Sequence, residues 1–174
     1  MSTPNAARNY FEDLAVPETL ELGTHTFTAE EMRAFAGRYD PQPFHLDEAA
    51  ARASLFGALT ASGWHTAAIF IARMTAHRQR IEDAMRARGE RPAAWGPSPG
   101  FKGLKWLRPV YVGDTIAFRS RRSGKIDLKS RPDRGMVLAD NEGVNQGGER
   151  VFAISTAILV ERRSPYVPDP PAQR

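Results

Sequence analysis

The 174-residue sequence contains no cysteine. Disulfide bonds, cysteine-ligated zinc sites and thiol catalysis are therefore excluded. The sequence also lacks an apolar run close to the roughly 20 residues that a membrane-spanning helix requires. Its N-terminus shows no continuous apolar segment of the kind found in signal peptides. We therefore expect a cytoplasmic protein without a membrane span.

The sequence also has little excess of positive over negative charge. The 24 Lys and Arg residues against 20 Asp and Glu residues leave a net charge of +4. This mild surplus suits an ordinary solvated surface, and it also suits a phosphorylated ligand. The cationic residues are spread along the chain and are not interleaved with aromatic residues as in a stacking platform for bases. We expect no nucleic-acid partner.

What is present is the composition of an ordinary globular domain. Hydrophobic residues make up 41% of the chain, and the length suffices for one sizeable core but is short for two. There are no internal repeats and no linker. We expect a single domain over residues 1–174, with a loose N-terminal end (about 1–10) and a Pro-rich C-terminal tail (about 164–174).

Helix signals dominate the first half of the chain. Thr28 followed by Glu31 forms a capping box, which predicts a helix to about Tyr39. Asp47 is the predicted N-cap of a second, short helix that ends near Ser54. Between these two helices the chain is predicted to cross a loop stiffened by prolines.

The most apolar stretch covers residues 62–75 and reads S-G-W-H-T-A-A-I-F-I-A-R-M-T. Its apolar residues are not confined to one side, and a helix of this kind is usually buried. The helix is predicted to continue with a polar, exposed character to about residue 89. A Pro/Gly loop over residues 90–100 follows.

Strand signals dominate the second half. In the first run, Gly103 and Pro109 indicate a bulge or a sheet edge, and Trp106 is predicted to lie in the core. N-Q-G-G-E at residues 145–149 predicts a hairpin turn. The last run is apolar on both faces, which predicts an interior position in the sheet. The expected strands cover residues 25–28, 101–110, 113–122, 134–146 and 151–162. Helices followed by an antiparallel meander, with one apolar helix to bury, predict an α+β fold in which a curved sheet wraps that helix.

The loop D-P-Q-P-F-H-L-D (residues 40–47) carries an acid and a histidine five positions apart. Asp40 and His45 are suited to general acid–base work, and a stiff loop can hold both groups on one water. An ordinary turn started by Asp before Pro, with an exposed histidine, explains the same residues. Asp40, His45 and Asp47 can also chelate a metal, but no further ligand cluster appears. We expect neither a metal nor a cofactor.

Ser62 and Gly63 open the apolar helix, where free N–H groups attract negative charge. Because Gly63 has no side chain, a ligand oxygen can approach its N–H and be stabilised there as it gains charge. The alternative is that Ser62 only caps the helix and Gly63 only eases packing. Trp64 can line a pocket or the core, and His65 is predicted to be packed.

In combination these segments resemble the MaoC-like hydratases, which include the (R)-specific enoyl-CoA hydratases. The resemblance rests on D-P-Q-P-F-H-L-D, on A-A-A-R-A-S-L-F-G, on T-A-S-G-W at the head of the apolar helix, and on F-K-G-L-K-W-L-R-P-V-Y-V-G-D-T with N-Q-G-G-E. It runs from about Phe27 to Val160. Two residues depart from the family pattern: Gln42 stands where Asn is usual, and Ser62 stands where His often precedes the glycine.

The resemblance implies a hotdog fold that forms a homodimer or a higher oligomer through its sheet. It also implies reversible addition of water to a trans-2-enoyl-CoA, with Asp40 and His45 activating the water. The Gly63 amide, flanked by Ser62 and Trp64, would polarise the thioester carbonyl. A hotdog acyl-CoA thioesterase and a non-catalytic acyl-CoA-binding protein remain as alternatives. The acyl chain and the arginines that would contact CoA are not indicated.

Overall fold

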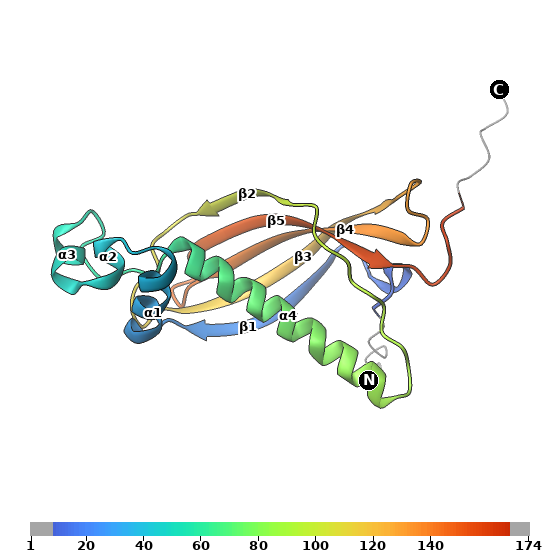
Figure 1. Ribbon diagram of the computed structural model, residues 1–174, viewed down its shortest axis with the longest axis horizontal. Helices are drawn as coiled ribbons and strands as arrows, with labels where there is room; N and C mark the ends of the chain where they lie inside the picture. The colour runs from blue at the N-terminus through green and yellow to red at the C-terminus, as the bar shows by residue number, and fades with distance from the viewer. Residues whose placement is uncertain (1–8, 168–174) are drawn as a thin grey trace, which may run out of the picture.

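A curved sheet of five antiparallel strands wraps the long helix α4 in the computed structural model, which describes residues 9–167 (Figure 1). The strand order is β1-β3-β4-β5-β2. The three short helices α1–α3 gather at one end of the sheet, where α4 begins. The elements are η1 (Phe11–Asp13), β1 (Glu18–Thr26), α1 (Ala29–Tyr39), α2 (Pro43–Leu46), α3 (Glu48–Ala53), α4 (Gly63–Ala87), β2 (Phe101–Trp106), β3 (Thr115–Asp127), β4 (Arg134–Val144) and β5 (Arg150–Glu161).

The predicted capping residues start the short helices. Glu31 N–H donates to Thr28 Oγ1 (3.3 Å), and Thr28 N–H donates to Glu31 Oε1 (3.1 Å), so the capping box of α1 is confirmed. Asp47 Oδ1 accepts from Ala50 N–H at 2.8 Å and caps α3, as predicted. The prediction of a plain loop between α1 and α3 was wrong. Pro43 begins a helical turn, α2, because its fixed φ suits the first position of a helix.

The sheet contains the expected meander of β3, β4 and β5, and the chain crosses the sheet twice, from β1 to β2 and from β2 to β3. β3, β4 and β5 pair in sequence order, while β1 pairs with β3 and β2 pairs with β5 at the opposite edge. β2 is therefore an edge strand, and its register shifts between Lys102 and Lys105, where Gly103 has a φ of +60°. The sequence predicted a bulge or an edge position for this strand, and the structure has both. β5 lies between two strands, as its two apolar faces indicated.

The main core lies between α4 and the concave face of the sheet. Phe70 of α4 packs against Phe152 of β5 and Phe118 of β3, with ring centroids 5.5 and 6.2 Å apart. All three phenylalanines are fully buried. The apolar sequence of α4 thus supplies the centre of the fold. None of the helices between residues 9 and 167 combines the length and apolar character that a bilayer crossing requires.

Trp106 does not belong to this core, and its predicted burial was wrong. Its side chain is 48% exposed, because β2 is an edge strand with a neighbour on one side only. The alternation of apolar residues in the sequence shows which residues share a face. It does not show how many neighbours that face has.

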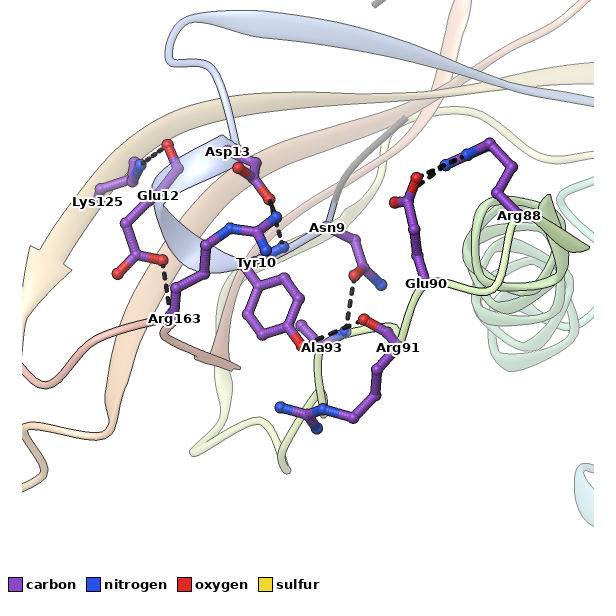
Figure 2. A network of polar contacts seen from close by, with 10 residues as sticks. All are labelled: Asn9, Tyr10, Glu12, Asp13, Arg88, Glu90, Arg91, Ala93, Lys125 and Arg163. Atoms are coloured by element: carbon purple, nitrogen blue, oxygen red, sulfur yellow. Dashed lines mark hydrogen bonds and ion pairs between the residues drawn. The ribbon is translucent and has the colours of Figure 1, made fainter. Parts of the chain in front are cut away.

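Both ends of the described chain are anchored beside α4 and the sheet (Figure 2). Asn9 and Tyr10 are buried: Asn9 Oδ1 accepts from Ala93 N–H at 2.8 Å, and Tyr10 Oη donates to the carbonyl of Arg91 at 3.1 Å. At the other end, Tyr166 N–H donates to the carbonyl of Pro132 at 2.8 Å. The rest of the expected loose end and tail, residues 1–8 and 168–174, lies outside the described residues.

Candidate active site

Asp40 stands at the C-terminal end of α1, where Pro41 prevents the helix from continuing. Its two carboxylate oxygens have different donors. Ser62 Oγ donates to Oδ2 at 2.7 Å, and Gln42 Nε2 donates to Oδ1 at 2.8 Å. These bonds hold the carboxylate between the end of α1 and the start of α4.

The pKa of Asp40 lies below its ordinary value of 3.8. Burial is the largest single influence and raises this pKa, because it disfavours the charged form. The hydrogen bonds from Ser62 and Gln42 together with the nearby His45 outweigh burial and lower the pKa. Asp40 is therefore an ionised carboxylate at neutral pH.

His45 lies in the helical turn α2 with its ring buried. Its Nδ1 lies 2.8 Å from the backbone carbonyl oxygen of Thr60. A carbonyl oxygen can only accept, so Nδ1 carries the hydrogen, and Nε2 is the unprotonated nitrogen of the neutral ring. Nε2 faces Asp40 Oδ2 at 3.4 Å. When the His45 ring is neutral, two hydrogen-bond acceptors therefore lie together at one point.

Ser62 and Gly63 form the start of α4, as predicted. Ser62 Oγ accepts from Trp64 N–H at 3.2 Å, so this hydroxyl both caps the helix and donates to Asp40. Gly63 is the first residue of α4, and its N–H has no carbonyl within the helix to bond. A Cβ at Gly63 would lie 2.4 Å from Trp106, which explains why this position takes glycine.

These groups share a pocket of about 480 Å³. Asp40, His45, Gly63 and Trp64 line it, and Ser62 lies behind Asp40 as its hydrogen-bond donor. Trp64 is 51% exposed, so of its two possible positions it takes the pocket and not the core. The remaining lining is largely apolar and includes one cation: Gln42, Phe44, Phe56, Thr60, Ala61, Thr66, Trp106, Leu107, Arg108, Pro109, Val110 and Val151.

His65 is packed, as predicted, and does not line this pocket. Its ring stacks on Phe35 with centroids 4.7 Å apart and meets the edge of Phe27 at 5.1 Å. Burial is the main cause that lowers its pKa, which favours the neutral ring. His65 therefore contributes to the core and carries no acid–base role.

A second cavity, of about 250 Å³, lies between α4 and the sheet, and it contains none of the five predicted site residues. Its lining is mainly apolar, with the buried Arg122 ion-paired to Glu18. As for metals, no group of three or more His, Cys, Asp or Glu side chains within residues 9–167 is placed to hold an ion.

The sequence did not point to four residues that complete the pocket. Gln42 bonds Asp40, the Thr60 carbonyl fixes the tautomer of His45, Trp106 covers Gly63, and Arg108 adds a cation. The contact between Gln42 and Asp40 could have been predicted, since the two residues are only two positions apart in the sequence. The Thr60 carbonyl carried none, because a backbone group leaves no mark on residue type.

Comparison with known proteins identifies the family. The model of the MaoC like domain matches residues 15–140, well over half of the chain. The chain belongs to the MaoC-like dehydratase family. A solved MaoC-like dehydratase from Rhodospirillum rubrum is 38% identical; the match covers 88% of this chain and 97% of that one, with a TM-score of 0.70.

A solved structure of lower identity has the same hotdog fold, and a curated hydratase matches part of the sequence. An R-hydratase from Pseudomonas aeruginosa is 20% identical with a TM-score of 0.62, and the match covers 96% of this chain and 97% of that chain. A mesaconyl-CoA hydratase from Cereibacter sphaeroides is 32% identical over 71 residues, which are 41% of this chain. This chain spans only 20% of that hydratase's length. Thus the fold and the family are established.

Proposed function

We propose that the protein adds water reversibly to the double bond of a trans-2-enoyl-CoA. The observation that carries this proposal is the 3.4 Å approach of His45 Nε2 and Asp40 Oδ2 in a pocket shared with Gly63 at the start of α4. One water can donate one hydrogen to each of these two acceptors. The free N–H of Gly63 then offers a separate place for a thioester oxygen.

In the proposed reaction His45 and Asp40 activate the water, and Gly63 N–H stabilises the charge on the thioester oxygen. The water oxygen bonds to C3 of the substrate while His45 Nε2 takes its proton, and the ionised Asp40 stabilises the imidazolium. The π electrons of C2=C3 move to form an enolate, whose oxygen gains charge beside Gly63 N–H and the positive end of α4. The proton on His45 is then delivered to C2. One water is added, and no metal or cofactor is needed.

The substrate side of the proposal rests on the pocket lining and on the relatives. Arg108 lines the pocket and pairs with Glu149 at 3.3 Å, and the remaining N–H groups of its exposed guanidinium are suited to a phosphate of CoA. The similarity to a mesaconyl-CoA hydratase makes short branched and dicarboxylic acyl groups worth testing beside straight chains. We propose an acyl-CoA thioester as substrate.

The decisive experiment incubates the protein with a panel of trans-2-enoyl-CoAs, including mesaconyl-CoA, and follows loss of the conjugated thioester absorbance. We expect hydration of at least one member. Asp40→Asn and His45→Gln should each lower kcat by about 10² or more, in the range for general acid–base groups. No absorbance loss with any acyl group would overturn the proposal. Release of free CoA without hydration would indicate a thioesterase, which attacks the carbonyl and not C3.

A further inference from the structure

We propose that the indole N–H of Trp106 is a second hydrogen-bond donor to the substrate's thioester oxygen, beside the N–H of Gly63. Trp106 is then a catalytic residue and not merely part of the pocket wall. This inference rests on the proposed hydration, in which that oxygen gains negative charge.

The indole ring of Trp106 lies directly against Gly63. A Cβ placed on Gly63 would be 2.4 Å from both Cε2 and Nε1 of Trp106, so the nitrogen-bearing part of the ring occupies the space that a side chain would need. Standard bond lengths put a residue's amide nitrogen about 2.5 Å from its Cβ position. Trp106 Nε1 therefore lies within about 5 Å of Gly63 N, by addition of these two distances.

That separation suits two donors that share one acceptor. Donors of an oxyanion hole each lie about 2.7–3.1 Å from the oxygen, so they can be no more than about 6 Å apart. The indole nitrogen also lies on the side that the Gly63 N–H faces, because Cα–Cβ vectors and free N–H groups at a helix start both incline toward the N-terminal end. The two nitrogens are thus close and lie on the same side of α4.

Trp106 belongs to the wall of the candidate site and is not enclosed by its neighbours. Trp106 is 48% exposed and lines the pocket that contains Asp40 and His45. Trp64 holds the ring from the side in an edge-to-face contact, with centroids 5.3 Å apart. An indole nitrogen can only donate, so Trp106 offers the thioester oxygen a neutral hydrogen bond.

The test removes the N–H while keeping the ring. Trp106→Phe is the simple variant, and Trp106 replaced by β-(3-benzothienyl)alanine keeps the indole shape with sulfur in place of N–H. With the enoyl-CoA that wild type hydrates fastest, both should lower kcat by about 10², the lower end of the range for one oxyanion donor. KM should change little, because the bond strengthens as charge develops.

A spectroscopic readout separates hydrogen bonding from packing. In an Asp40→Asn background that slows turnover, the carbonyl stretch of the same substrate, labelled with ¹³C at C1, should shift to lower frequency on binding. Removal of the indole N–H should reverse part of that shift. Trp95→Phe is the matched control, since Trp95 is a half-buried indole away from the pocket, and it should leave both kcat and the carbonyl band unchanged.

The outcomes distinguish this inference from the function on which it rests. If wild type hydrates an enoyl-CoA but the benzothienyl variant keeps its kcat and its carbonyl band, the donor role of Trp106 is wrong while the hydratase proposal stands. If Trp106→Phe loses activity and the benzothienyl variant does not, the ring matters only through its shape. If wild type hydrates no enoyl-CoA, the hydratase proposal falls, and the donor role falls with it.

Discussion

At the scale of single residues, Ser62 connects the two halves of the candidate site. Its one hydroxyl hydrogen goes to Asp40, and its lone pairs remain for the N–H of Trp64. One short side chain therefore helps to lower the pKa of Asp40 and caps the first turn of α4.

We predict that Ser62→Ala raises the pKa of Asp40, because the variant removes the strongest of the interactions that hold this pKa down. A ¹³C titration of the aspartate carboxyls, with Asp40→Asn used to assign the signal, measures the change. Ser54→Ala is the matched control, since Ser54 Oγ caps the end of α3 and does not contact Asp40. An unchanged Asp40 titration in Ser62→Ala would show that the hydroxyl does not support the carboxylate.

The lowered pKa of Asp40 also determines how the Ser62–Asp40 hydrogen bond contributes to folding stability at different pH. The folded pKa lies below the ordinary value of 3.8, so ionised Asp40 stabilises the folded protein above that value. This contribution is lost as the pH falls through the folded pKa. The stability difference between wild type and Ser62→Ala should therefore narrow with acidification, as urea unfolding at several pH values can measure.

At the scale of secondary-structure elements, the start of α4 is fitted to the edge strand β2. Gly63 and Trp106 come from different elements, and the indole ring fits against the glycine without space for another carbon. Gly37 in α1 gives a contrast, because a Cβ there would meet its closest heavy atom, Leu46 Cδ2, at 3.9 Å. The two glycines thus differ in packing although both are helical.

We predict opposite effects for the same substitution at these two glycines. Gly63→Ala should destabilise the fold by about 1–3 kcal/mol, the usual cost of forcing extra volume into a packed contact, and should lower activity. Gly37→Ala should stabilise it by about 0.5–1 kcal/mol through helix propensity. Chemical denaturation measures both. If Gly63→Ala left the free energy of unfolding unchanged, Trp106 would have to move away from the new methyl group without loss of stability.

The difference between these glycines also shows how far the sequence could predict the structure. Local signals predicted the capping box at Thr28, the cap at Asp47 and the apolar helix correctly, because each depends on residues within one turn. The exposure of Trp106 and its contact with Gly63 depend on β2 crossing to the far edge of the sheet. No short-range pattern records that crossover. The site followed the same rule: Asp40 and His45 lie five residues apart in the sequence, whereas their partners Ser62 and Thr60 come from further along the chain.

At the scale of the whole molecule, the edge strand β2 leaves the sheet open on the side of the candidate site. Phe101, Trp106 and Leu107 are 56%, 48% and 44% exposed along this edge. An open, apolar strand edge attracts another strand. This edge is the one through which we expect two copies of the chain to pair, in line with the dimer that the resemblance implies.

We predict that Phe101→Asp weakens this dimer by at least about 30-fold, because a charge placed in an apolar contact costs as much as losing an interface hot spot, about 2 kcal/mol. Size-exclusion chromatography with light scattering across a concentration series measures the shift. Leu55→Asp is the matched control: Leu55 is 89% exposed but lies between α3 and α4, away from the strand edge. A dimer that resists Phe101→Asp would place the interface elsewhere, and a wild-type monomer at all concentrations would contradict pairing.

Because Trp106 belongs to both this edge and the pocket, dilution of the Phe101→Asp variant should also lower its specific activity if the partner chain holds the indole in place.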